Sequence, residues 1–153
     1  MKNRYYLAYG SNLNFKQMNS RCHDAKYIGK AIIKDYALLF KGRGHLTIEP
    51  RVGSEVPVGV WLLSQDDEMV LDRQEGFPDY YHKENFTLEV NKIDGETQTL
   101  DCFAYVMQAD EPITPPSSEY VAICTEGYQD FGFDTNYLKA AQKESENEKL
   151  PQK

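Results

Sequence analysis

Glu75 occupies a position in the sequence that favours proton transfer. A helix is expected to begin at Ser64, where Ser-Gln-Asp-Asp has the pattern of a capping box, and to end at Gly76. Glu75 then lies in the last turn, where the negative end of the helix dipole favours a protonated carboxyl group. Burial among the aromatic residues that follow would raise its pKa further, toward the working pH of a general acid or base. The alternative is an exposed glutamate, because Asp72 and Arg73 are typical surface residues.

A turn near the N-terminus is the second place where chemistry is expected. Gly10-Ser11-Asn12-Leu13 follows a predicted strand at 5–9 and precedes a predicted short helix at 14–22. Between a strand and a helix, consecutive backbone N–H groups point outward and can hold an anion. The same residues also form ordinary turns. Ser11 is not expected to be a nucleophile, because it lacks the Gly-x-Ser-x-Gly elbow and a neighbouring histidine.

Composition and charge exclude several classes of function. The 153 residues carry a formal net charge of −7 and no run of Lys or Arg, so nucleic acid is not an expected partner. No segment approaches the roughly 18 to 20 apolar residues of a membrane span, and we expect a cytoplasmic protein without membrane contacts. The three cysteines and three histidines show no metal-ligand spacing, so no metal site is expected.

Strand-like and helix-like segments predict one α+β domain. A helix is expected to open at Pro115-Pro116-Ser117-Ser118, and Asp94-Gly95 predicts the turn of a hairpin. A last short helix is expected near residue 137. We predict a folded domain over 1–142 and a disordered tail over 143–153, because the tail is almost entirely polar. The strands predicted after the first are 26–28, 31–33, 36–40, 45–50, 56–63, 80–90 and 97–107.

Four motifs together resemble the γ-glutamylcyclotransferase-like family in their order and spacing. The resemblance covers nearly the whole chain before the tail and implies a small mixed β-barrel flanked by helices. It also implies a cavity whose floor is the loop from Tyr9 to Leu13. The motifs are Tyr6-Leu7-Ala8-Tyr9-Gly10-Ser11-Asn12-Leu13, Gly59-Val60-Trp61, Leu71-Asp72-Arg73-Gln74-Glu75-Gly76 and Pro116-Ser117-Ser118-Glu119-Tyr120.

The resemblance assigns roles to individual residues. Glu75 matches the family's proton-transferring glutamate. Tyr120 matches a cavity tyrosine, and Tyr81 matches a second one, with Tyr80 as the alternative. The substrate-binding residues that the resemblance implies in the first loop are Tyr9, Gly10, Ser11, Asn12 and Leu13. The segment Phe77-Pro78-Asp79 departs from the commoner glycine-containing turn at the rim of the cavity.

The implied activity is an intramolecular cyclisation of a small γ-glutamyl compound. Its α-amine attacks its own γ-carbonyl, 5-oxoproline forms and an amine leaves, without a cofactor. Glu75 would take the proton from the attacking amine and deliver one to the leaving nitrogen. The loop amides would hold either the developing oxyanion or the substrate's α-carboxylate.

Other functions on the same scaffold stay open from the sequence. The leaving group is either an amino acid or a simple amine, and the shape of the pocket would decide which. A different class of function is a small-molecule binding protein in which Glu75 grips an amine without turnover. The sequence makes no prediction about oligomeric state.

Overall fold

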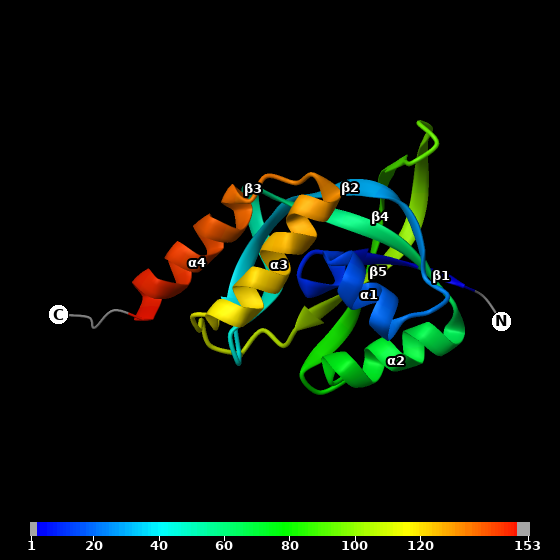
Figure 1. The fold of residues 1–153 in the computed structure, drawn as a ribbon. Coiled ribbons are helices and arrows are strands. Elements are labelled where there is room, and N and C mark those ends of the chain that lie inside the picture. The colour runs from blue at the N-terminus through cyan, green and yellow to red at the C-terminus, as the bar shows by residue number, and fades with distance from the viewer. Residues whose placement is uncertain (1–2, 150–153) are drawn as a thin grey trace.

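Five strands close into a barrel with helices packed around it in the computed structural model, which describes residues 3–149 (Figure 1). The strand order is β1-β3-β2-β4-β5, so the predicted mixed barrel flanked by helices is confirmed. The elements are β1 (Arg4–Ala8), the 3₁₀ turn η1 (Ser11–Leu13), α1 (Phe15–Arg21), β2 (Lys26–Lys41), β3 (His45–Leu63), α2 (Gln65–Glu75), β4 (Tyr81–Lys92), β5 (Thr97–Met107), α3 (Ser118–Phe131) and α4 (Asn136–Lys149).

β1 makes the barrel mixed. It pairs antiparallel with β3, where Leu7 lies opposite Val60, and parallel with β5, where Tyr6 lies opposite Phe103. These four side chains are buried in the core. The chain that leads into the first loop is therefore fixed between two neighbouring strands before it turns at Gly10.

The strands β2 and β3 differ from the sequence prediction, which divided them into five short strands. Each is one long strand, and the two pair along nearly their whole length. The predicted turns are irregularities within the ladder, with register shifts at Tyr27/Gly29 and Lys34/Tyr36. At Gly29 a side chain would lie 2.2 Å from the carbonyl oxygen of Asn91, so this glycine permits β2 to approach β4 and close the barrel.

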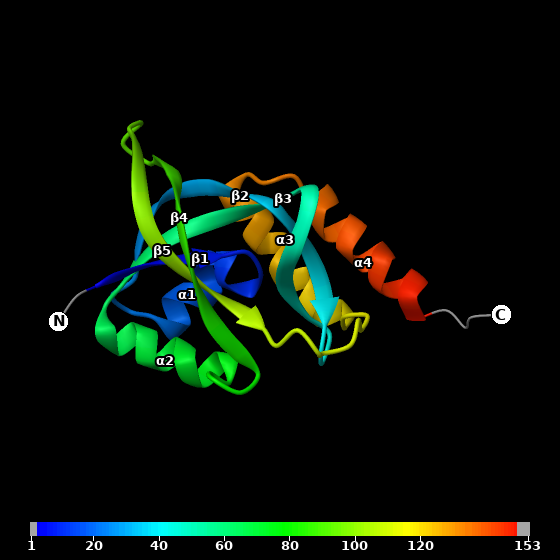
Figure 2. The same cartoon turned by 180° about the vertical axis from the view of Figure 1, so that it is seen from behind.

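The structure contains the hairpin of β4 and β5 that the sequence predicted. It also contains the two predicted main helices, α2 and α3. The β4–β5 hairpin projects beyond the barrel in both views (Figures 1 and 2). Ser64 caps α2, because its side chain accepts a hydrogen bond from the N–H of Asp67, and Ser117 caps α3 in the same way. Across residues 3–149, no helix combines the length and apolar character that crossing a bilayer requires.

The predicted tail boundary at residue 142 is wrong for residues 143–149, because α4 continues to Lys149. Leu138, Ala141 and Ser145 are buried at helical spacing where α4 packs against β2. Glu144 also forms a two-pronged ion pair with Arg51 of β3, with N–O distances of 3.1 and 2.8 Å. The face of α4 that packs against β2 therefore consists mainly of small side chains, which the polar composition of this segment did not indicate. Residues 150–153 of the predicted tail lie outside the described residues.

The helix α3 lies directly over the first loop at Gly127. A methyl group added there would lie 2.6 Å from the backbone nitrogen of Asn14 and 2.8 Å from the carbonyl carbon of Leu13. Gly127→Ala is therefore expected to destabilise the fold by about 1–3 kcal/mol, although alanine is the better helix former. Urea unfolding would measure this. Gln129→Ala, on the exposed face of the same helix, should change stability by less than about 0.5 kcal/mol; equal effects would contradict the packing.

Candidate active site

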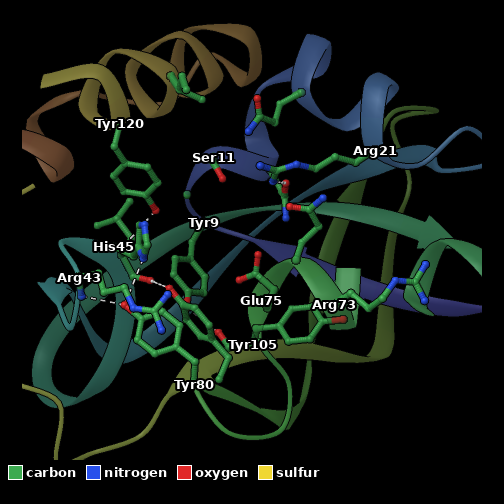
Figure 3. Close-up of a pocket in the computed structure, with 18 of the residues that line it drawn as sticks. Tyr9, Ser11, Arg21, Arg43, His45, Arg73, Glu75, Tyr80, Tyr105 and Tyr120 are labelled. Carbon is green, nitrogen blue, oxygen red and sulfur yellow. Dashed lines mark hydrogen bonds between the residues drawn. The ribbon is translucent and has the colours of Figure 1, made fainter. Parts of the chain in front are cut away.

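A cavity of about 450 Å³ opens where the first loop, the C-terminal end of α2, the β2–β3 turn and α3 meet (Figure 3). This volume is in the usual range for small-molecule sites, about 300–1,000 Å³. The residues that line it are Tyr6, Tyr9, Gly10, Ser11, Asn12, Gln17, Arg21, Arg43, His45, Leu46, Arg73, Gln74, Glu75, Gly76, Tyr80, Tyr81, Tyr105, Tyr120 and Ile123. The glutamate and the glycine turn selected from the sequence therefore share one cavity.

Glu75 is the last residue of α2, and its carboxyl group points into the cavity (Figure 3). Gly76 ends the helix in the left-handed conformation, and its N–H donates to the carbonyl oxygen of Arg73. Burial raises the pKa of Glu75 to about 7, although the nearby Arg21 acts to lower it. The carboxyl group is thus poised to gain or lose a proton near neutral pH.

A cluster of paired charges docks α2 against the barrel one and two turns before Glu75. The ammonium of Lys83 lies 2.6 Å from Glu68 and 2.9 Å from Asp72, both on α2. Its nitrogen also lies 4.5 Å from the ring centroid of Phe77. The hydroxyl of Tyr105 donates to Asp72 at 2.6 Å, so a tyrosine of the cavity wall is tied to the same helix.

The first loop is held by hydrogen bonds from buried aromatic side chains. Tyr128 donates to the carbonyl oxygen of Tyr9 at 3.1 Å, and the indole N–H of Trp61 donates to that of Asn12 at 3.1 Å. The Tyr9 hydroxyl donates to the carbonyl oxygen of Tyr105 at 2.5 Å. These bonds hold the turn through its carbonyl oxygens and the Tyr9 side chain, and none of them uses its N–H groups.

The N–H groups of the loop differ in their availability. Leu13 donates its N–H to the carbonyl oxygen of Gly10 at 3.1 Å, and its fully buried side chain is absent from the cavity wall. The predicted role of Leu13 in substrate binding therefore has no support from its position. Within residues 3–149, the N–H groups of Ser11 and Asn12 have no protein acceptor, as expected for the first residues of a 3₁₀ turn.

The predicted tyrosines line the cavity as neutral groups. Burial raises the pKa of Tyr9, Tyr81 and Tyr120 well above the ordinary phenol value, and the charge of Glu75 raises each further. Two of them bracket Leu46: the hydroxyl of Tyr81 donates to its carbonyl oxygen at 2.7 Å, and that of Tyr120 accepts from its N–H at 3.1 Å. They line the wall as protonated phenols that are hydrogen-bonded to the backbone of the barrel.

Several cavity residues were not predicted from the sequence. Arg43 lies in the β2–β3 turn, His45 is the first residue of β3, Arg21 ends α1, and Tyr105 lies on β5. Tyr80, named only as the alternative to Tyr81, lines the cavity beside it. Of these residues, only Arg43 has a sequence pattern that could have drawn attention to it. It lies between two glycines at 42–44, a pattern typical of an exposed turn.

His45 is a cavity group whose ordinary pKa already lies near neutrality. Burial and the charge of Arg43 lower the pKa of His45, so its imidazole is neutral at physiological pH. Its Nδ1 lies 3.1 Å from the hydroxyl of Tyr80. Among residues 3–149, no three His, Cys, Asp or Glu side chains are grouped as metal ligands.

Comparison with known proteins identifies the family of this chain. The family model described as "Gamma-glutamyl cyclotransferase, AIG2-like" matches residues 6–122, a span that contains both Glu75 and the first loop. The chain belongs to this γ-glutamyl cyclotransferase family. The resemblance inferred from the four sequence motifs is therefore confirmed.

Relatives of the γ-glutamyl cyclotransferase family match most of this chain. It is 29% identical to the γ-glutamylcyclotransferase of Bos taurus over 144 residues, covering 88% of this chain and 74% of the relative. It is 30% identical to that of Homo sapiens over 142 residues, covering 86% and 73%. A solved structure titled "Gamma-glutamyl cyclotransferase" superposes with a TM-score of 0.76 at 26% identity, covering 92% of this chain and 87% of that one.

Proposed function

We propose that this chain cyclises a γ-glutamyl compound to 5-oxoproline and releases the amine, with Glu75 as the proton-transferring group. The observation that supports the proposal most is the carboxyl group of Glu75, which faces the cavity with a pKa raised to about 7. Ser11 and Asn12, whose N–H groups have no acceptor among residues 3–149, line the same cavity. A base and a pair of anion-binding donors are the parts that this reaction requires.

The reaction needs no group beyond the substrate and these residues. The α-ammonium of the substrate gives a proton to the Glu75 carboxylate, and the freed amine attacks the γ-carbonyl carbon. A new C–N bond closes the five-membered ring, and negative charge develops on the carbonyl oxygen. The carboxyl group of Glu75 then gives its proton to the leaving nitrogen as the original C–N bond breaks. The ring nitrogen gives up its second proton through the regenerated Glu75 carboxylate to the released amine, which departs as an ammonium.

Glu75 is better suited to this role than the other titratable groups of the cavity. The tyrosines stay protonated because their pKa values are raised, so they cannot accept a proton. His45 is neutral, but its Nδ1 lies within hydrogen-bonding distance of Tyr80. The carboxyl group of Glu75 makes no hydrogen bond to another side chain among residues 3–149, which leaves both oxygens available to a substrate.

Release of 5-oxoproline from a panel of γ-glutamyl amino acids and γ-glutamylamines tests the proposal. Turnover of any member, detected by chromatography of 5-oxoproline and of the freed amine in equal amounts, is the expected result. Tight binding across the panel without either product would contradict it and favour a binding protein instead. The rate at which 5-oxoproline forms from each compound in buffer without protein is the background rate to subtract.

A further inference from the structure

The cavity carries more positive than negative charge. Three arginines line it, Arg21, Arg43 and Arg73, and among residues 3–149 Glu75 is the single carboxylate in its wall. A γ-glutamyl compound of a simple monoamine is a zwitterion without net charge, whereas one of an amino acid carries an additional carboxylate. Complementary charge therefore favours the substrate with the additional carboxylate.

Arg43 and Arg21 lie on opposite sides of the Glu75 carboxyl group in the view of Figure 3. Arg21 belongs to the side of the first loop, because its guanidinium donates to the side-chain oxygen of Asn12 at 2.7 Å. Arg43 belongs to the side of His45 and Tyr80. If the glutamyl half occupies the loop, the leaving amine lies toward Arg43.

The backbone and side chain of Arg43 are both held in place. Its N–H donates to the Tyr80 hydroxyl at 2.8 Å, and its guanidinium carbon lies 4.6 Å from the centroid of the same ring. The neighbouring Gly42 N–H donates to the carbonyl oxygen of Pro112 at 2.8 Å. Stacking on a ring leaves the edge of a guanidinium free to donate two parallel hydrogen bonds to a carboxylate.

The guanidinium of Arg43 has no ion-pair partner in the described part of the chain, residues 3–149. Glu111 is near enough to raise the pKa of Tyr80, yet it forms no ion pair with Arg43. The neighbouring His45 is neutral and competes for no anion. A fixed cation at the wall of a cavity, with no carboxylate of its own, is a receptor for an anionic group of the ligand.

The geometry points to Arg43 as the residue that binds a carboxylate on the leaving amine, so that the preferred substrates are γ-glutamyl amino acids and not γ-glutamylamines. This inference rests on the proposed function, because it assigns the leaving-group half of that reaction. Arg43 is a specificity residue and takes no part in proton transfer. Its side chain is exposed to solvent, so its contribution is expected to be about tenfold, the lower end for a charged hydrogen bond.

Two substrates that differ by one carboxylate test this inference. Ethylamine is alanine without its carboxyl group, so γ-glutamylalanine and γ-glutamylethylamine isolate that group. Wild-type kcat/KM is expected to favour γ-glutamylalanine by about tenfold. In Arg43→Gln the value for γ-glutamylalanine should fall by that factor, while the value for γ-glutamylethylamine should stay within about twofold. Arg43→Lys, which keeps the charge but loses the planar fork, should retain part of the preference.

The matched control is Arg51→Gln, the same substitution at an exposed arginine that pairs with Glu144 outside the cavity. It should leave the substrate preference unchanged. Equal wild-type rates on the two substrates would overturn the inference. An equal loss on both substrates in Arg43→Gln would also overturn it, because Arg43 would then serve the glutamyl half.

A failure of the proposed function can be distinguished from a failure of the inference about Arg43. If wild-type protein releases no 5-oxoproline from either compound, calorimetric affinities decide the inference without turnover. Tighter binding of γ-glutamylalanine that disappears in Arg43→Gln upholds a carboxylate site at Arg43. Equal affinities for the two compounds overturn it.

Discussion

Glu75→Gln is expected to lower kcat for 5-oxoproline release by at least about a hundredfold. The amide keeps the size of the carboxyl group but can neither take the proton from the substrate ammonium nor return it to the leaving nitrogen. Loss of a positioned general base typically costs about 10²–10⁴ in rate. Steady-state kinetics with the best substrate of the panel would measure the loss, and KM should change far less because the cavity keeps its shape.

The stability of Glu75→Gln separates a catalytic role from a structural one. The pKa of Glu75 in the folded protein is raised from 4.5 to about 7, so the folded state binds more protons than the unfolded state between these values. Stability therefore falls as pH rises through this window, and the buried carboxylate is a cost above it. At pH 8 the variant should unfold at a higher urea concentration than the wild type.

The matched control for this variant is Glu96→Gln in the β4–β5 turn, which is exposed and distant from the cavity wall. Glu96→Gln should keep wild-type kcat and stability. If Glu75→Gln retains more than about a tenth of wild-type kcat, the assignment of the proton transfer to Glu75 is wrong. In that case His45→Gln should be measured next, because histidine has an ordinary pKa near neutrality and His45 lines the same cavity.

Lys83→Ala is expected to destabilise the fold by about 3 kcal/mol. The side chain of Lys83 is only 16% exposed and neutralises Glu68 and Asp72, which face it at 2.6 and 2.9 Å. Removing one partner of a largely buried ion pair leaves its carboxylates unpaired, which typically costs about 3–5 kcal/mol. Arg4 still pairs with Glu68 at 2.7 Å and keeps the cost at the lower end. Urea unfolding at pH 7 would measure the change.

Lys34→Ala is the control for this substitution. Lys34 also lies on a barrel strand and pairs with a glutamate, Glu55, but at 3.5 Å and with 77% of its side chain exposed. An exposed pair contributes about 0–1 kcal/mol, so this variant should unfold close to the wild type. Equal destabilisation by the two substitutions would show that burial of the Lys83 cluster does not hold α2 in place.

The two ends of α2 and the turn between β4 and β5 could be predicted from the sequence, because each depends on local chemistry. Ser64 and Gly76 supply the cap and the left-handed end of α2, and Asp94-Gly95 forms the turn between β4 and β5. The position of Glu75 followed from the same helix boundary. A short segment of sequence was therefore enough to predict the structure wherever that structure depends on residues close together in the chain.

The features that the sequence did not predict depend on contacts between distant segments. Lys34 and Asp35 resemble a turn in the sequence. In the structure, β2 pairs with β3 on both sides of them, so they form an irregularity within one long strand. Residues 143–149 look disordered by composition, and packing against β2 makes them helical. Arg43 reaches the cavity because Tyr80, 37 positions away, anchors its turn.

The pKa of Glu75, measured by ¹³C NMR titration of its side-chain carboxyl carbon, tests the central claim most directly. Glu75 faces the cavity from the C-terminal end of α2, and we expect a pKa of about 7, against 4.5 for an ordinary glutamate. The acid limb of the pH profile of kcat/KM should fall with the same midpoint, because protonated Glu75 cannot act as the base. A pKa near 4.5, or an acid limb unrelated to the titration of Glu75, would contradict the account.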